Sequence, residues 1–190
     1  MKNKFPLLKH LFSKLSPSLF YQSVFFFFVA SVTGYIWEVL LTCILNGTLC
    51  NRGFLYGPWL PVYGFGALFL SLLLNRFSSR PIVTFFLSAI LGSLLELITG
   101  LALSTYWHTR YWDYSTLPFH IEGYISLLSF LGFGFAGSLW ICFLSPRLSR
   151  LWSGLPLKLR KRSTYFFLTL FLLDYLISFL IPNTGQGITF

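Results

Sequence analysis

Five apolar runs, each close to the length of a membrane-spanning helix, constrain this chain more than any other feature. They lie at about 19–45, 59–75, 81–104, 122–145 and 163–181. About 20 apolar residues are needed to cross the roughly 30 Å hydrocarbon core of a bilayer. Hydrophobic residues make up 55% of the 190 residues and charged residues only 10%. The sequence therefore predicts an all-α integral membrane protein with about five transmembrane helices.

The positions of the basic residues predict the orientation. Lysine and arginine number 14 against five acidic residues, a net charge of +9. All but two of the basic residues lie before the first run, between the second and third runs, or between the fourth and fifth runs. The alternate connections contain only Arg52 and Arg110. Because cytoplasmic loops carry the basic excess, we expect a cytoplasmic N-terminus, an extracytoplasmic C-terminus and no nucleic-acid partner.

The expected organisation is a single membrane domain at 18–190 behind a cytoplasmic tail at 1–17. Four apolar side chains of the tail share one helical face, which indicates an interfacial helix, with a frayed tail as the alternative. They are Leu8, Leu11, Phe12 and Leu15.

A shift of 58 positions aligns the costly polar residues of one half with those of the other. Glu38 falls on Glu96, Arg52 on Arg110 and Tyr56 on Tyr114. The alignment predicts two duplicated helical hairpins, at about 19–75 and 81–145, with a fifth helix at about 163–181 outside the repeat.

Each aligned glutamate closes a stripe of small residues spaced four apart, such as Gly92, Glu96 and Gly100. Small residues allow close helix packing in lipid, so we expect both glutamates to face protein, about 10–12 Å below the outer helix ends. A charge at the bilayer centre costs roughly 2.5–3.5 kcal/mol on insertion scales. Two interpretations stay open: salt bridges that lock the hairpins, or an outward-facing polar site that binds substrate or carries protons.

Five residues are candidates for that substrate-binding site, namely Glu38, Glu96, Arg52, Arg110 and Asp174. Asp174 belongs to the set because it lies at a similar depth in the fifth run.

The connection between the first two apolar runs, NGTLCNRGFLYGPWLPVYGFG (46–66), is rich in glycine and proline, and we call it the first outer connection. Only about 16 uninterrupted apolar residues are available to the segment that follows. Such a segment either re-enters the membrane, where irregular backbone is tolerated if it is buried in protein, or is a surface loop before a helix kinked at Pro61.

The second outer connection, STYWHTRYWDYSTLPFHIEG (104–123), joins the third and fourth runs. It contains four ionisable residues without equivalents in the first outer connection: His108, Asp113, His120 and Glu122. These are the candidate catalytic residues, because a histidine beside a carboxylate can do acid–base chemistry. Their spacing matches no zinc motif, and we expect no metal and no cofactor.

Several segments together resemble a family of small bacterial membrane proteins described as putative ABC-transporter permeases of the CmpB type. They are RGFLYGPWLPVYGFGAL (52–68), LLELITG (94–100), RYWDYS (110–115), EGYISL (122–127), Asp174 and PNTGQGI (182–188). The resemblance implies a protein of the bacterial cytoplasmic membrane with a role in transport.

The sequence contains no GxxxxGK[ST] motif, so ATP hydrolysis by the P-loop mechanism would need a separate ATPase subunit. The basic segment 146–162 could dock such a subunit or bind lipid headgroups. Homo-oligomers are also compatible with the sequence.

The leading hypothesis is a transport component. The alternatives are an intramembrane enzyme acting on a lipid or lipoprotein at the outer leaflet, and a non-catalytic membrane assembly protein.

Overall fold

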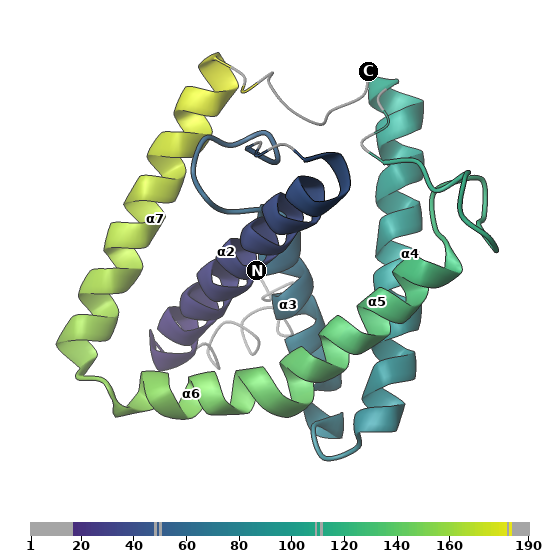
Figure 1. The fold of residues 1–190 in the computed structure, drawn as a ribbon. Coiled ribbons are helices and arrows are strands. Elements are labelled where there is room, and N and C mark those ends of the chain that lie inside the picture. Colours follow the sequence, from purple (N-terminus) through teal and green to yellow (C-terminus); the bar gives the residue numbers. More distant parts are fainter. Residues whose placement is uncertain are drawn as a thin grey trace, which may run out of the picture.

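The computed structural model describes residues 17–47, 49, 51–108, 110, 112–181 and 183. Within these residues every secondary-structure element is a helix (Figure 1), which confirms the predicted all-α fold. Four helices are long and apolar enough to cross a membrane, and a fifth apolar helix is shorter. The interfacial helix expected within residues 1–17 falls on residues outside this description, apart from Pro17.

The helices follow the apolar runs in order. They are α2 (Pro17–Asn46), α3 (Pro61–Leu74) with a 3₁₀ turn η1 (Asn75–Phe77), α4 (Pro81–Trp107), α5 (Leu127–Ser138), a π-helical segment η2 (Leu139–Leu144), α6 (Ser145–Gly154) and α7 (Leu157–Leu180). Pro61 and Pro81 open their helices where a missing N–H costs nothing. Ser126 caps α5 by exchanging hydrogen bonds with Ser129.

The largest difference from the expected boundaries lies in the basic segment 146–162. We expected a connection there, but α5, η2 and α6 continue as one rod to Gly154, and α7 already begins at Leu157. The helix continues because α6 has one apolar side: Trp152 is buried and stacks on Phe25 at a ring distance of 4.3 Å. Hydropathy therefore located these helices along the chain but did not predict where they end.

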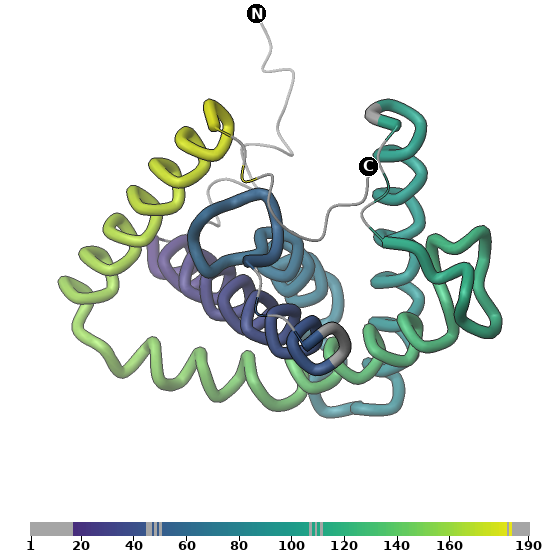
Figure 2. Tube along the Cα trace, turned by 45° about the horizontal axis from the view of Figure 1, so that its top comes forward, coloured from purple at the N-terminus to yellow at the C-terminus, as the bar shows by residue number. Residues whose placement is uncertain are grey.

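The helices form a flanked pair. In Figures 1 and 2, α2 and α3 lie between α7 on one side and α4 on the other, and the rod of α5, η2 and α6 passes below them. The most extensive helix contacts join α4 to α5 and α2 to α3.

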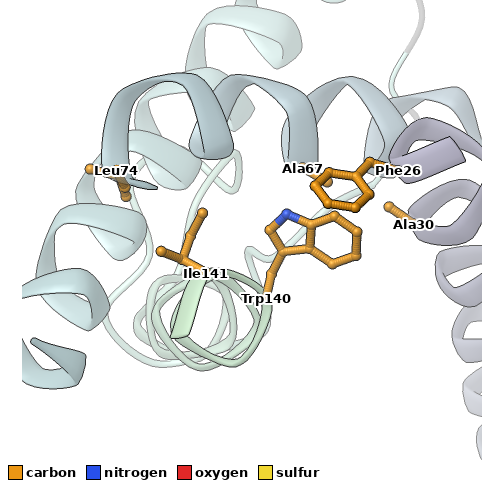
Figure 3. Close-up of a cluster of buried hydrophobic side chains, with 6 residues drawn as sticks. All are labelled: Phe26, Ala30, Ala67, Leu74, Trp140 and Ile141. Atoms are coloured by element: carbon orange, nitrogen blue, oxygen red, sulfur yellow. The ribbon is translucent and has the colours of Figure 1, made fainter. Parts of the chain in front are cut away.

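The π-helical segment supplies the centre of the core. Trp140 and Ile141, both in η2, are buried against α2 and α3 (Figure 3). The Trp140 indole N–H donates a 2.9 Å hydrogen bond to Ser71 Oγ, and its ring meets Phe26 edge-on at 5.5 Å. An aromatic anchor with a satisfied polar atom thus ties the rod to the central pair.

The first outer connection descends beside α2 instead of lying above it. The Leu60 N–H donates a 3.1 Å hydrogen bond to the Ser31 carbonyl in the middle of that helix, and Leu55 and Trp59 are buried. The helix that follows, α3 with η1, is shorter than the other four. The connection therefore packs against α2 before the short helix α3.

Candidate functional site

Glu38 is held by two donors from its own hairpin. The Tyr63 hydroxyl, in the first turn of α3, donates a 2.6 Å hydrogen bond to Glu38 Oε1. The Arg52 guanidinium reaches Glu38 Oε2 at 3.5 Å, and both side chains of this ion pair are about a quarter exposed, at 26% and 25%. The carboxylate therefore has a neutralising partner at membrane depth.

Glu96, the aligned residue in α4, has a different environment. The Tyr114 hydroxyl donates a 3.0 Å hydrogen bond to Glu96 Oε1, whereas Oε2 is buried without a hydrogen-bond partner among the described residues. The Ser129 hydroxyl interacts with this carboxylate and also donates a 3.1 Å hydrogen bond to the Ser126 carbonyl. No described cation forms an ion pair with Glu96.

The two glutamate–tyrosine pairs are close enough to influence each other. Tyr63 interacts electrostatically with Glu96, and Tyr114 interacts electrostatically with Glu38. The pKa of Tyr114, which lies in the second outer connection, is raised above its ordinary value, mainly by burial and then by Glu96 and Glu38. We call these four residues, Glu38, Tyr63, Glu96 and Tyr114, the Glu–Tyr cluster.

Small residues bring these pairs together. A Cβ at Gly34 would overlap the Tyr63 ring, and one at Gly92 would overlap Phe133 of α5. Each small-residue stripe thus packs against the second helix of its own hairpin. This contact places Tyr63 beside Glu38, one turn above Gly34.

Asp174 of α7 fixes the first outer connection. Its carboxylate accepts hydrogen bonds from the backbone N–H groups of Tyr56 at 3.1 Å and Gly57 at 3.0 Å, and from the Trp59 indole at 2.7 Å. The Ser178 hydroxyl adds a longer contact at 3.4 Å. This predicted binding residue therefore lies apart from the Glu–Tyr cluster in its contacts, and its oxygens are engaged within the protein.

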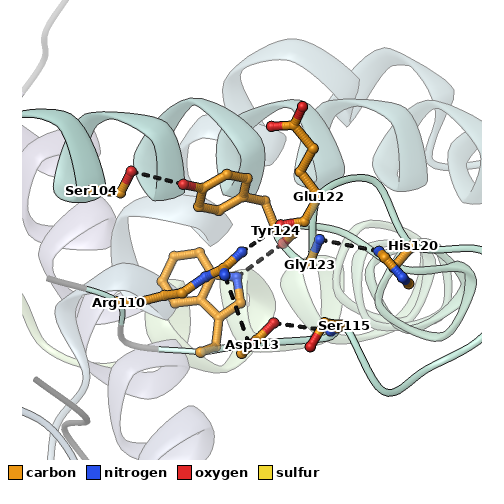
Figure 4. A network of polar contacts seen from close by, with 9 residues as sticks. Ser104, Arg110, Asp113, Ser115, His120, Glu122, Gly123 and Tyr124 are labelled. Carbon is orange, nitrogen blue, oxygen red and sulfur yellow. Dashed lines mark hydrogen bonds and ion pairs between the residues drawn. The ribbon is translucent and has the colours of Figure 1, made fainter. Parts of the chain in front are cut away.

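Arg110 aligns with Arg52 in the sequence, but among the described residues it does not form the corresponding ion pair with Glu96. Its guanidinium pairs with Asp113 at 3.7 Å, donates to the Glu122 carbonyl, and lies over the Tyr124 ring at 4.6 Å. Figure 4 shows this network folding the second outer connection onto itself. A left-handed backbone at His108, directly after α4, directs the chain into this turn.

The four candidate catalytic residues do not converge on one point. His108, Asp113, His120 and Glu122 are all exposed. His120 Nδ1 accepts the Gly123 N–H at 3.2 Å, Asp113 accepts the Ser115 N–H at 2.9 Å, and the Glu122 carboxylate points away from both (Figure 4). Among the described residues, no group of three or more His, Cys, Asp or Glu side chains could hold a metal ion.

Sequence reasoning missed Tyr63 and Ser129, and it gave Tyr114 no role beyond its alignment with Tyr56. The tyrosines carried a weak signal, because a hydroxyl at membrane depth needs a partner. The alignment pairs Tyr114 with Tyr56, but the two hydroxyls have different partners. The Tyr114 hydroxyl donates to Glu96, whereas the Tyr56 hydroxyl donates to the Ile181 carbonyl at 3.1 Å.

Comparison with known proteins gives one finding on ancestry. A family model described as "Putative ABC-transporter type IV" matches residues 25–179, which include every member of the Glu–Tyr cluster. Comparisons with curated proteins and with solved structures find no match.

Proposed function

The chain belongs to the putative ABC-transporter type IV family, and on this premise we propose that it is a membrane transport component whose substrate pathway passes the Glu–Tyr cluster. Ionisable residues inside membrane segments are expensive and mark substrate, ion or proton pathways in transport proteins. The proposal assigns that role to Glu38 and Glu96, with Tyr63 and Tyr114 as their hydrogen-bonding partners.

One observation carries this proposal: two glutamates in different candidate membrane-spanning helices each accept a hydrogen bond from a tyrosine hydroxyl, and one of them keeps an unsatisfied oxygen. A lattice of structural salt bridges would pair both glutamates with cations, yet only Glu38 has such a partner among the described residues. Glu96 Oε2 is buried without a donor. A group that is left unsatisfied in this way is available to a ligand.

The remaining predicted binding residues receive supporting roles. Arg52 neutralises Glu38, Asp174 holds the first outer connection against α7, and Arg110 folds the second outer connection. All three position the segments that surround the cluster, and none of them needs to contact substrate.

Energy for transport would come from a separate ATPase subunit, since the sequence has no P-loop. Its docking surface would be α6 and the first turns of α7. Five basic side chains are exposed there, namely Arg147, Arg150, Lys158, Lys161 and Arg162. Anionic lipid headgroups are the competing partner for the same surface.

The test is complementation of a deletion strain of the native host. Metabolites are quantified inside the cells and in the medium, after return of the wild type, of the double variant Glu38→Gln/Glu96→Gln, or of the control Glu122→Gln. The control removes an exposed carboxylate outside the cluster. Membrane abundance of each variant is measured in parallel.

We expect the deletion to redistribute at least one metabolite, and the wild type and Glu122→Gln to restore its distribution. The double variant should fail to do so at equal abundance. Full restoration by the double variant would contradict the role of the cluster, and a deletion without any redistribution would contradict transport itself.

A further inference from the structure

We infer that the two aligned glutamates have diverged in role: Glu96 holds an exchangeable proton, whereas Glu38 forms an ion pair with Arg52. The significance of this proton for transport rests on the proposed function, but the protonation itself does not. The chemical step is a simple ionisation, in which the Glu96 carboxylic acid gives its proton to water on the outer side and later recovers it.

The contacts of Glu38 stabilise a negative charge. Its two oxygens face the Tyr63 hydroxyl at 2.6 Å and the Arg52 guanidinium at 3.5 Å. Protonation of Glu38 would leave Arg52 with less compensation in a partly buried position.

The contacts of Glu96 favour the neutral acid. Glu96 Oε1 accepts a hydrogen bond from the Tyr114 hydroxyl, and Oε2 is buried with no hydrogen-bond partner within the geometric limits among the described residues. No described cation neutralises it, because Arg110 is engaged with Asp113, the Glu122 carbonyl and the Tyr124 ring. An uncompensated charge in such a place is costly, and a proton removes it.

Ser129 of α5 supplies a place for that proton. Its hydroxyl lies near the Glu96 carboxylate; it accepts the Ser126 N–H at 3.0 Å and donates to the Ser126 carbonyl at 3.1 Å. A serine oxygen has two lone pairs, so one remains to accept a hydrogen bond from protonated Glu96.

The other titratable groups around Glu96 strengthen this preference. Glu38 of α2 has its oxygens engaged by the Tyr63 hydroxyl and the Arg52 guanidinium. Tyr63 of α3 and Tyr114 of the second outer connection are neutral phenols with their hydroxyls directed at the two carboxylates. None of these elements presents a cation to Glu96 among the described residues.

Infrared spectroscopy of the purified full chain tests the inference directly. A protonated carboxylic acid has a carbonyl stretching band that ionised carboxylates lack, and the band shifts on exchange into heavy water. We expect this band at neutral pH in the wild type and in Glu38→Gln, and its loss in Glu96→Gln. Absence of the band from the wild type, or its persistence in Glu96→Gln, would overturn the inference.

A second variant covers the case in which Glu96→Gln fails to fold. Tyr114→Phe removes the donor to Glu96 Oε1, which is the carbonyl oxygen of the neutral acid, so the band should move to higher frequency. An unchanged band in folded Tyr114→Phe would assign it to another group and would also overturn the inference.

The spectrum and the complementation assay fail separately. A Glu96 band together with normal transport by Glu38→Gln/Glu96→Gln would contradict the proposed function and leave the proton in place. Loss of transport by that variant without any Glu96 band would do the reverse.

Discussion

The Trp59 indole N–H donates a 2.7 Å hydrogen bond to the Asp174 carboxylate, although 115 positions separate the two residues in the chain. Together with the N–H groups of Tyr56 and Gly57, this bond attaches the first outer connection to α7. The connection in turn carries Arg52 to Glu38 and leads into the helix that bears Tyr63. One carboxylate at the edge of the molecule therefore supports the geometry at its centre.

Replacement of Asp174 by alanine should loosen this connection. Three donors of the first outer connection and the Ser178 hydroxyl lose their acceptor at once, and a single hydrogen bond to a charged group is worth about 1.5–3 kcal/mol. We expect the free energy of unfolding to fall by at least that amount and amide hydrogen exchange in residues 53–60 to accelerate. Exchange as slow as in the wild type, with Glu122→Ala as the exposed-carboxylate control, would contradict the anchoring role.

Arg52 and Glu38 should show energetic coupling. Arg52→Met leaves the Glu38 carboxylate without its cation, and addition of Glu38→Gln should recover part of the lost stability. Residues in one ion pair usually show coupling of about 0.5–3 kcal/mol. Thermal unfolding in detergent of both single variants and the double variant measures it, and strictly additive effects would show that the pair contributes nothing.

Gly34→Ala should be disruptive although the change is a single methyl group. The new Cβ would overlap the Tyr63 ring, and overpacking of this kind costs about 1–3 kcal/mol. Gly66→Ala is the matched control, because it lies in α3 with no atom within 4 Å of the added Cβ. We expect a lower unfolding temperature for Gly34→Ala and an unchanged or higher one for Gly66→Ala. The opposite order would contradict the close packing of the small-residue stripe of α2 against α3.

The second outer connection should open only in strong acid. The Ser115 backbone N–H, donating to the exposed Asp113, lowers the pKa of that carboxyl below its ordinary value. Its stabilising effect is therefore complete above the unfolded pKa of about 3.9 and is lost as the pH falls through the lower folded value. Cleavage by pepsin should increase over that range in the wild type.

Asp113→Asn provides the comparison, because its side chain has no charge to lose. Cleavage of this variant within the second outer connection should be faster and nearly independent of pH in the same range. If the wild type and Asp113→Asn show the same pH profile, Asp113 does not hold the connection closed.

Hydropathy and charge were sufficient for the class of fold. The apolar runs predicted five helical segments, and the structure has them, because burial in lipid requires an unbroken backbone hydrogen-bond pattern. The same signal could not predict that α6 continues through the basic residues Arg147 and Arg150. Helix continuation depends there on Trp152 packing against Phe25, a contact between distant parts of the sequence.

Among the described residues, the glutamate–arginine pair considered for both hairpins is present in one of them only. An arginine folded down from the outer connection was one of two interpretations for each glutamate, and this arrangement holds for Glu38 but not for Glu96. The difference comes from backbone geometry: left-handed conformations at His108, Phe119 and Glu122 close the second connection on itself. Residue types aligned by a fixed offset do not reveal such turns.

The link between Trp59 and Asp174 also fixes an order of assembly in the cell. The first outer connection follows the first helix, but its main acceptor belongs to α7, which is synthesised more than a hundred residues later. During insertion its backbone donors must find other partners until α7 enters the bilayer. The attachment of the first outer connection to α7 is thus completed late in biogenesis, after the chain through α7 has left the ribosome.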